Sequence, residues 1–226
     1  MKCEIKYAPR NLDEVIYPSV SVERRIKGYA AGQLEGNIIL YGSNGTGKTT
    51  LANLLVKQLG GSHPQTERCD AEELLAKPDL KLYLRQAAAM AAITTSEKHF
   101  MVLNEFDNAK KNASKFWTAL DACGSGVMAI ITTNEPMDIH KSVRSRCDLI
   151  EMPGISARAA LERIQYCLTC EGLDLPDQQV LAYLSTVEQY QDLRKYFKLA
   201  DELLYLWRSD LPMPNWSGKK PSIHVV

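Results

Sequence analysis

The chain has 226 residues, of which 45% are hydrophobic and 24% are charged, and its formal net charge is zero. This composition is ordinary for a globular protein with a hydrophobic core, and the length suits one large domain or one medium and one small domain. A net charge of zero excludes attraction of nucleic acid by the molecule as a whole, so any such contact would need a local basic patch.

The six cysteines are scattered along the chain and form no disulfide framework. The first residues do not form a signal peptide, and no apolar run is long enough to span a bilayer. We therefore expect a protein of the reducing cytoplasm that has no membrane partner.

The first two thirds of the chain alternate between strand-like and helical patterns. Residues 1–18 are expected to form an extended arm, punctuated by Pro9 and Pro18. Beyond the arm, short apolar runs predict strands and 3.6-residue periodicity predicts helices. The expected strands are 37–41, 66–69, 99–103, 127–132 and 148–152, and the expected helices are 20–33, 50–57, 71–95 with a break at Pro78, and 113–123. This alternation predicts an α/β fold with a parallel, doubly wound sheet.

After Pro153 the pattern becomes helical throughout. Ser156 suits the N-cap of the first of these helices, and Pro176 suits the start of the second. The expected helices are 156–170, 177–185 and 191–207. The predicted organisation is an α/β domain over 1–153, a small all-helical domain over 154–208 and a C-terminal tail over 209–226.

A glycine-rich turn follows the strand predicted at 37–41. Its pattern, Gly-x4-Gly-Lys-Thr, fits a phosphate-binding loop that leads from a strand into a helix. The glycines let backbone N–H groups surround phosphates, and the helix N-terminus adds partial positive charge. Lys48 is expected to reach the β- and γ-phosphates and Thr49 to bind Mg²⁺, so the chain is predicted to bind a nucleoside triphosphate with magnesium. The residues expected to bind the nucleotide here are Gly42, Ser43, Asn44, Gly45, Thr46, Gly47, Lys48, Thr49 and Thr50.

Two predicted strands end in side chains that suit hydrolysis of a triphosphate. The strand over 99–103 runs into Asn104 and Glu105, where phosphate-loop ATPases place a metal-binding carboxylate and then a glutamate that activates water. Glu105 is expected to be the base, whereas Asn104 offers the metal an uncharged oxygen. Asn134 follows the strand over 127–132 and is either a turn residue or the group that orients the attacking water.

Two arginines, Arg144 and Arg146, precede the last predicted strand. A pair of arginines is normally part of a solvated surface, but an arginine can also act on the γ-phosphate bound by a neighbouring subunit. The residues by themselves leave both interpretations open.

The order of these motifs resembles that of AAA+ ATPases, and within that superfamily it is similar to the small ATPase subunits of sliding-clamp loaders. The resemblance extends from about residue 5 to residue 207 and implies an AAA+ αβα domain, followed by a helical lid, that binds and hydrolyses ATP. Beyond the phosphate loop, the matching segments are Lys-Tyr-Ala-Pro-Arg-Asn-Leu-Asp-Glu-Val-Ile at 6–16, Asn-Glu-Phe-Asp at 104–107, Ser-Arg-Cys at 145–147 and Asp-Leu-Arg-Lys at 192–195.

The resemblance also implies a role for individual residues. Arg146, rather than Arg144, would complete the active site of the adjacent subunit, and Arg194 would contact the γ-phosphate within its own subunit. The implied catalytic residues are Lys48, Glu105, Asn134, Arg146 and Arg194. Thr49 and Asn104 would bind the metal. The residues of the arm that would help to hold the adenine are Tyr7, Pro9, Arg10, Val15 and Ile16.

The implied partners are other loader subunits, the sliding clamp and primer–template DNA. A basic turn before the helix predicted at 113–123 suits sequence-independent phosphate contacts, and the alternative is a solvated turn. Arg85, on the helix before the Glu105 strand, would restrain Glu105 until DNA binds. The expected DNA-contacting residues are Lys110, Lys111, Ser114, Lys115 and Arg85.

Three departures from the family pattern keep other functions open. Ala8 stands where the family has arginine, Asn104 replaces the metal carboxylate, and the chain ends shortly after the lid, without the helical collar that usually holds the pentamer together. One alternative is a helicase loader or other short AAA+ replication factor. The other is a structural subunit that binds nucleotide with weak or no hydrolysis. A compact loader of this kind would suit a bacteriophage.

Overall fold

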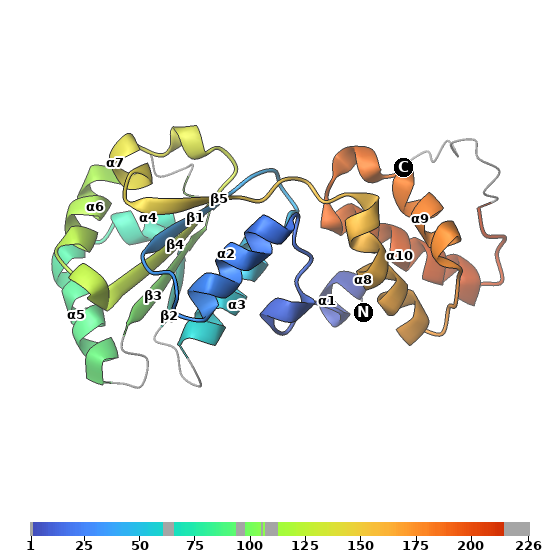
Figure 1. Ribbon diagram of the computed structural model, residues 1–226, viewed down its shortest axis with the longest axis horizontal. Helices are drawn as coiled ribbons and strands as arrows, with labels where there is room; N and C mark the ends of the chain where they lie inside the picture. Colours follow the sequence, from blue (N-terminus) through green and yellow to red (C-terminus); the bar gives the residue numbers. More distant parts are fainter. Residues whose placement is uncertain (1, 61–65, 94–97, 105, 107–112, 215–226) are drawn as a thin grey trace. The chain divides into compact units, whose positions relative to one another are not determined.

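The computed structural model describes residues 2–60, 66–93, 98–104, 106 and 113–214 (Figure 1). These residues pack into two compact units. The sheet unit comprises Arg10–Val15 and Ser19–Pro153, and the helical unit comprises residues 2–9, Ile16–Pro18 and the described residues from Gly154 onward.

A five-stranded parallel sheet forms the centre of the sheet unit, in the order β2-β3-β4-β1-β5. The predicted parallel, doubly wound α/β sheet is therefore confirmed. The strands are β1 (Asn37–Tyr41), β2 (Thr66–Asp70), β3 (His99–Asn104), β4 (Val127–Thr133) and β5 (Cys147–Glu151). β5 begins and ends one residue earlier than expected, because it pairs with β1 from Asn37 opposite Cys147 to Tyr41 opposite Glu151.

Helices cover both faces of this sheet (Figure 1). Every described residue of β4 is buried, as expected of a strand with a helical layer on either side. One layer is formed by α2 (Val20–Ala30) and α3 (Lys48–Leu59). The other is formed by α4 (Ala71–Leu75), α5 (Leu80–Ile93), α6 (Ala113–Asp121) and α7 (Lys141–Arg144). Short 3₁₀ turns at Leu12–Glu14 (η1), Gly124–Gly126 (η3) and Pro136–Asp138 (η4) complete the unit.

The break predicted at Pro78 separates α4 from α5. The proline ring cannot continue a helix, and the side chain of Asp79 then accepts a hydrogen bond from the Leu82 N–H at 2.9 Å, which caps the start of α5. Ser19 caps α2 in the same way, because its hydroxyl accepts from the Val22 N–H at 3.3 Å.

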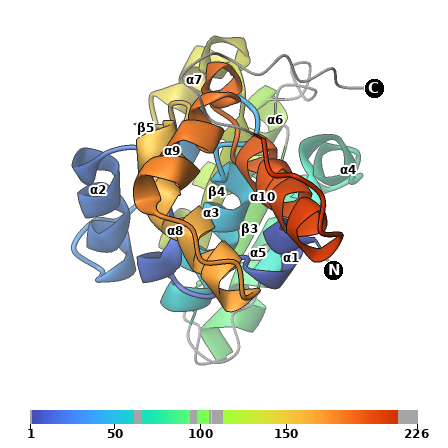
Figure 2. The same cartoon turned by 90° about the vertical axis from the view of Figure 1, so that its right-hand side faces the viewer.

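The helical unit contains α8 (Ala157–Cys170), α9 (Asp177–Ser185) and α10 (Leu193–Arg208), together with the short α1 (Cys3–Lys6) and the 3₁₀ turn η5 (Glu188–Tyr190). Ser156 caps α8 as predicted, since its hydroxyl accepts from the Ala159 N–H at 3.2 Å. The three long helices enclose one apolar core, and α1 packs against α10 (Figure 2).

The extended arm expected over residues 1–18 is wrong. The segment forms α1 and η1 instead, with Cys3 and Tyr7 buried in the core of the helical unit and Leu12 buried in the sheet unit. Asn11 starts η1, because its side-chain oxygen accepts from two backbone N–H groups of that turn. A single helical turn is too short to produce the periodicity from which helices are predicted.

The start of the expected tail also packs against the helical unit. Leu211 N–H donates to the Leu206 carbonyl at 3.0 Å, the Tyr183 hydroxyl donates to the Pro214 carbonyl at 3.0 Å, and Met213 contacts the apolar core. Residues 215–226 lie outside the described residues. Within the part of the chain that the structure describes, no helix is long and apolar enough to cross a membrane.

Candidate functional site

The candidate site lies at the carboxyl end of β1. The chain leaves β1 for β2, on the far side of β3 and β4, and later returns to place β5 on the opposite side of β1. Open parallel sheets bind ligands outside the carboxyl ends of their strands at such a reversal of strand order. The glycine-rich turn over residues 42–47 occupies this position, between β1 and α3.

Three glycines give this turn a backbone that other residues rarely adopt. Gly42, Gly45 and Gly47 have φ angles of 142°, 72° and 85°, in the region where a side chain is strained. Gly47 also occupies the N-cap of α3 and has no side chain with which to cap it. The first N–H groups of a helix have no intrahelical acceptor, so they are directed at the turn and are suited to bind an anion.

The Lys48 ammonium is directed into the same turn and is 9% exposed. It donates to the carbonyls of Gly42 and Ser43, both at 2.7 Å, and to the side-chain oxygen of Asn134 at 3.0 Å. Thr46 is buried as well, and its hydroxyl donates to the Ser43 carbonyl at 3.1 Å. A cation, a helix N-terminus and a glycine-rich turn therefore converge at one point, and this arrangement fits the phosphates of a nucleotide.

Asn134 reaches Lys48 because β4 is the neighbour of β1. Tyr41 pairs with Thr133 across the two strands, and Asn134 follows directly. The structure thus brings together Lys48 and Asn134, which are 86 residues apart in the sequence. Thr49 and Thr50 lie exposed in the first turn of α3, and Ser43 and Asn44 are exposed in the loop.

Asn104 lies at the end of β3 and contacts the neighbouring strand. Its side-chain oxygen accepts from the hydroxyl of Thr132, a buried residue of β4, at 3.4 Å. Glu105, the predicted base, lies outside the described residues. Among the residues described, no group of three or more His, Cys, Asp or Glu side chains could hold a metal ion. Magnesium normally binds through few protein ligands and several phosphate oxygens, so a bound nucleotide would have to supply most of its coordination.

Arg146 follows α7, the helix that the His140 side chain caps. Its Nη1 donates to the Ser142 carbonyl at 3.0 Å, and the same carbonyl accepts from the Ser145 hydroxyl at 3.1 Å. The side chain is 47% exposed. Arg144, in contrast, directs its Nη1 at the Met137 sulfur at 2.6 Å. Of the two arginines, Arg146 is the one whose guanidinium lies beside acceptors at the surface.

Tyr7 and Arg194, both predicted to contact the nucleotide, belong to the helical unit. Tyr7 is 9% exposed, and its hydroxyl donates to the Glu171 carboxylate at 2.7 Å. Arg194 lies in the first turn of α10, is 66% exposed and forms a long ion pair with Glu4, with Nε 3.9 Å from Oε1. Its role toward a γ-phosphate stays a prediction.

The arm residues expected to hold the adenine are divided between the units. Tyr7, Pro9 and Ile16 belong to the helical unit, whereas Arg10 and Val15 belong to the sheet unit. Ile16 packs against the apolar core of the helical unit. The Arg10 N–H donates to the Glu14 carboxylate at 3.0 Å, which closes the turn around η1.

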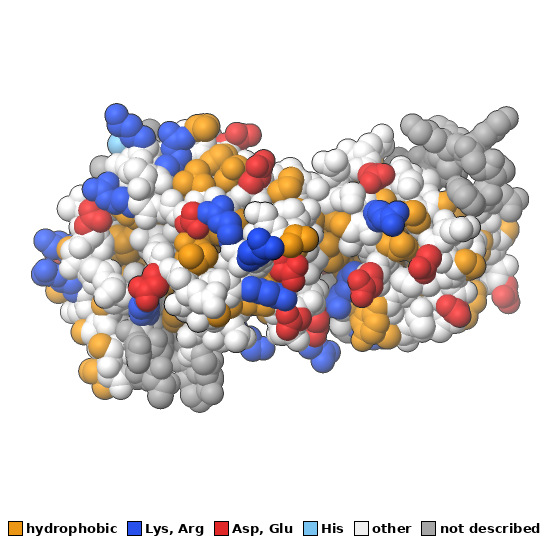
Figure 3. All heavy atoms as spheres, viewed as in Figure 1, with side chains coloured by type: hydrophobic (Ala, Val, Ile, Leu, Met, Phe, Trp, Pro, Cys, Tyr) orange, Lys and Arg blue, Asp and Glu red, His pale blue; other side chains and the backbone are white. Residues whose placement is uncertain are grey.

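The predicted DNA-contacting residues are only partly described. Lys115 is exposed at the start of α6, and its ammonium donates to the Lys77 carbonyl at 3.1 Å. Arg85 is exposed on α5. Burial raises the pKa of the nearby Cys123 thiol above its ordinary value, and the positive charge of Arg85 partly opposes this rise. Lys110, Lys111 and the side chain of Ser114 lie outside the described part. Basic and acidic side chains are interspersed on the face of the molecule shown in Figure 3.

The parallel sheet, the glycine-rich turn after β1 and the lysine held in that turn define a phosphate-loop nucleotide-binding protein. A family model agrees: "ATPase family associated with various cellular activities (AAA)" matches residues 38–154, just over half of the chain. The chain belongs to this family, and nucleotide binding is the shared property that its site retains.

Curated relatives confirm the predicted resemblance to clamp-loader small subunits. The replication factor C small subunit of Aeropyrum pernix is 27% identical over 207 residues, which cover 89% of this chain and 62% of the relative. Replication factor C small subunit 1 of Pyrobaculum arsenaticum is 24% identical over 197 residues, which cover 86% of this chain and 59% of the relative. The chain thus spans about 60% of the length of these relatives.

Solved structures confirm the fold. A variant of Thermotoga maritima RuvB superposes with a TM-score of 0.70 at 16% identity, covering 92% of this chain and 69% of that one. The AAA domain of FIGL-1 in complex with ADP superposes with a TM-score of 0.66 at 14% identity, covering 86% of this chain and 73% of that one. At sequence identities this low, the superpositions show a shared fold alone.

Sequence reasoning missed the side chains that surround Arg146. The Asp121 carboxylate lies 3.5 Å from its Nη2, and the Trp117 ring centroid lies 5.7 Å from its guanidinium carbon. Trp117 and Asp121 are four residues apart and therefore share a face of α6. That spacing is visible in the sequence, but it does not reveal that α7 packs against this face.

Proposed function

We propose that this chain is an ATP-dependent subunit of a sliding-clamp loader, which binds primer–template DNA and loads the processivity clamp during DNA replication. The observation that carries the proposal is the contact between Lys48 and Asn134 at the carboxyl end of β1. This contact unites the phosphate loop with the amide predicted to place the attacking water. The similarity to replication factor C small subunits gives the loader class.

In the proposed reaction, ATP supplies the γ-phosphate that water attacks. Lys48 leaves the carbonyls that hold it and binds the β- and γ-phosphates, while the N–H groups of the turn and of α3 bind the remaining oxygens. Thr49 and Asn104 hold Mg²⁺ together with the phosphates. Glu105 takes the proton of the attacking water, and Asn134 orients that water.

Two arginines complete the proposed site from outside the phosphate loop. Arg194 senses the γ-phosphate from the lid of its own subunit, and Arg146 reaches the γ-phosphate of a neighbour. The ATPase would therefore depend on assembly with other loader subunits. Binding of ATP would favour the assembly that takes up the clamp and DNA, and hydrolysis would release it.

Asn104 favours a second candidate function, a subunit that binds nucleotide with weak or no hydrolysis. Its amide oxygen carries no net charge and already accepts from the Thr132 hydroxyl. A neutral ligand binds Mg²⁺ less strongly than a carboxylate does. In this case the nucleotide would stabilise an assembly in which a different subunit hydrolyses ATP.

One set of turnover measurements separates the two candidates. ATP hydrolysis by the wild type, Lys48→Ala and Asn104→Asp is measured with and without primer–template DNA and the cognate clamp. A loader subunit is stimulated by DNA and clamp and loses turnover in Lys48→Ala. Turnover that appears only in Asn104→Asp would establish the second candidate, and wild-type turnover that DNA and clamp do not change would refute the loader.

A further inference from the structure

The guanidinium of Arg146 is held by three groups of its own sheet unit. The Ser142 carbonyl lies 3.0 Å from Nη1 and the Asp121 carboxylate lies 3.5 Å from Nη2. The Trp117 ring centroid lies 5.7 Å from the guanidinium carbon, within the range of a cation–π contact. The arginine thus has an acceptor on each of two sides and an aromatic ring beside it.

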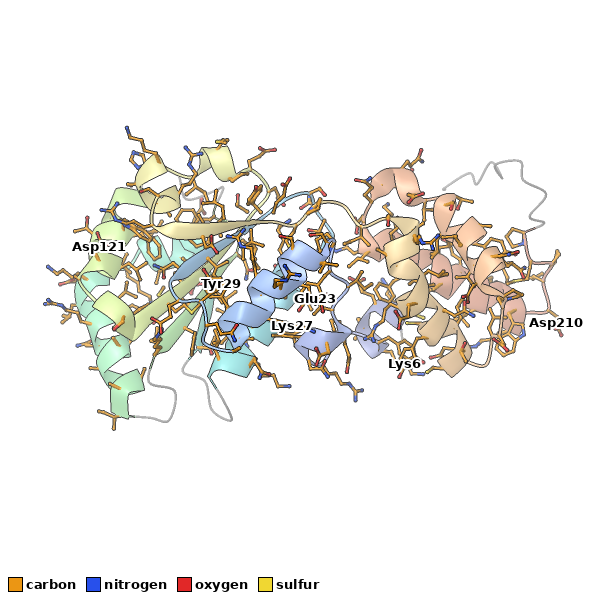
Figure 4. All side chains as sticks on the ribbon, in the orientation of Figure 1. Lys6, Glu23, Lys27, Tyr29, Asp121 and Asp210 are labelled. Atoms are coloured by element: carbon orange, nitrogen blue, oxygen red, sulfur yellow. The ribbon has the colours of Figure 1, made fainter. Side chains whose placement is uncertain are left out.

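These groups come from two elements that are fixed by burial. Trp117 is 4% exposed and belongs to the apolar core of the sheet unit, where its ring contacts Phe116 edge-on. Val143 of α7 is fully buried in the same core. Asp121 projects from the end of α6 (Figure 4) and is 52% exposed, so it meets Arg146 at the surface of this packed pair of helices.

We propose that Asp121 is a positioning residue for Arg146, which it holds against the Trp117 ring in the geometry needed to reach a phosphate bound by a neighbouring subunit. The inference rests on the proposed function, in which Arg146 acts in trans. In this proposal Asp121 contacts neither the nucleotide nor the attacking water, and its effect on hydrolysis passes through the arginine.

The contacts of Arg146 leave it able to bind phosphate. A guanidinium has five N–H donors in a planar fork, and the contacts with Ser142 and Asp121 engage one nitrogen each. The other donors are available to the oxygens of a γ-phosphate. Holding the side chain beforehand removes rotamer freedom that would otherwise be lost when the subunits meet.

Folding stability depends little on this ion pair. Both partners are about half exposed, with side-chain exposures of 47% and 52%, and exposed pairs are screened by water. Replacement of Asp121 should therefore leave the fold intact and change the orientation of Arg146. This property makes the proposal testable in the full chain.

The experiment compares Asp121→Ala, Asp121→Asn, Arg146→Ala and the double variant in the complex formed with ATP, primer–template DNA and the clamp. We expect Arg146→Ala to lower kcat by about 10³-fold and Asp121→Ala to lower it by about fivefold. The dissociation constant of each isolated chain for ATP should not change, because the arginine serves a neighbour's nucleotide. In the double variant, loss of Asp121 should have no further effect.

Glu23→Ala is the matched control, because Glu23 forms a similarly exposed ion pair with Lys27 at 2.9 Å on the opposite face of the sheet. It should leave kcat unchanged. Asp121→Asn keeps a hydrogen-bond acceptor but loses the charge, so its kcat should lie between those of the wild type and Asp121→Ala. If Asp121→Ala has wild-type or higher turnover while Arg146→Ala is impaired, Asp121 does not position the arginine. If Arg146→Ala itself retains full turnover, the proposed trans role fails instead.

Discussion

Gly42 is constrained both by its backbone conformation and by its nearest neighbour. Its φ angle is 142°, and a Cβ atom at this position would lie 2.1 Å from the carbonyl oxygen of Met152. The Met152 N–H in turn donates to the Tyr41 carbonyl at 2.6 Å, so the chain beyond β5 is bound to the end of β1. The first glycine of the phosphate loop thus allows close approach of two backbone segments.

We predict that Gly42→Ala lowers the free energy of unfolding by about 3 kcal/mol, because the methyl group forces the two segments apart in an already strained conformation. Chemical denaturation of both proteins measures the difference. The variant should also bind ATP more weakly, since the Gly42 carbonyl that holds Lys48 moves with the turn.

Gly32→Ala is the control for this prediction. Gly32 has a φ angle of 68° with no atom within 4 Å of the Cβ position, so its replacement should cost only about 1 kcal/mol of backbone strain. Equal destabilisation by the two variants would show that backbone conformation alone, and not the contact with Met152, makes Gly42 necessary.

At the residue scale, the sequence indicated a phosphate site from a local pattern, but it did not indicate which distant residues contact each other. The identity of Lys48 and its place in a glycine-rich turn were sufficient to predict a phosphate site, because a local pattern specifies the local backbone. The contact of Gly42 with Met152 and that of Arg146 with Asp121 join distant segments, and no local pattern encodes them. These contacts became visible only with the fold.

At the scale of elements, α2 is attached to the edge of the sheet by polar contacts. Arg25 forms an ion pair with the Asp148 carboxylate and donates to the Leu149 carbonyl at 3.0 Å, and the Tyr29 hydroxyl donates to Asp148 at 3.0 Å. Tyr29, labelled in Figure 4, is 3% exposed. Burial and this hydrogen bond raise the pKa of its phenol above the ordinary value.

We predict that Asp148→Ala destabilises the protein by about 2 kcal/mol, because it leaves a buried tyrosine hydroxyl without its acceptor. Thermal or chemical unfolding measures the loss. Asp13→Ala is the control, since it removes an ion pair between Lys27 and a carboxylate that is 82% exposed. That variant should remain within about 0.5 kcal/mol of the wild type, and a loss as large as that of Asp148→Ala would contradict the explanation.

Elements were predictable where a pattern was long. Four of the strands and the long helices follow from mostly apolar runs and periodicity, because burial between helical layers favours such runs. The remaining strand, β2, has the largely polar sequence Thr-Glu-Arg-Cys-Asp. α1 and η1 were not predictable in this way, since each has at most one turn. Their positions depend instead on burial of Cys3, Tyr7 and Leu12 against distant helices.

At the scale of the whole molecule, the first residues of the chain form part of the helical unit. The Glu171 carboxylate, after the end of α8, accepts from Lys6 and Tyr7 near α1 and from Arg208 at the end of α10. These hydrogen bonds lower the pKa of Glu171 to about 2, and the hydrogen bond from Lys6 contributes the most. The backbone carbonyl of Tyr7 accepts a hydrogen bond from Arg163 at 2.6 Å, and the Tyr7 ring packs edge-on against the Tyr166 ring with the centroids 5.9 Å apart.

We predict that acid weakens this unit through Glu171. The folded-state pKa of about 2 is lower than the ordinary value of 4.5, so the stabilisation is complete above about pH 4.5 and is lost as the pH falls toward 2. Glu171→Gln should have a lower free energy of unfolding than the wild type at pH 7. The difference in free energy between the two proteins should become smaller as the pH falls from about 4.5 toward 2. Denaturation followed at several pH values checks this, and a difference independent of pH would contradict it.

The chain passes between the two units after residues 9, 15, 18 and 153. The helical unit is therefore assembled from three stretches of sequence, and Cys3 and Tyr7 belong to its core. A gene fragment that encodes only residues 154–208 would lack these side chains and expose the surface that they cover. Exchange of the helical unit between relatives by recombination would have to transfer residues 2–9 as well, and a protein designed to contain this unit alone would have to include them.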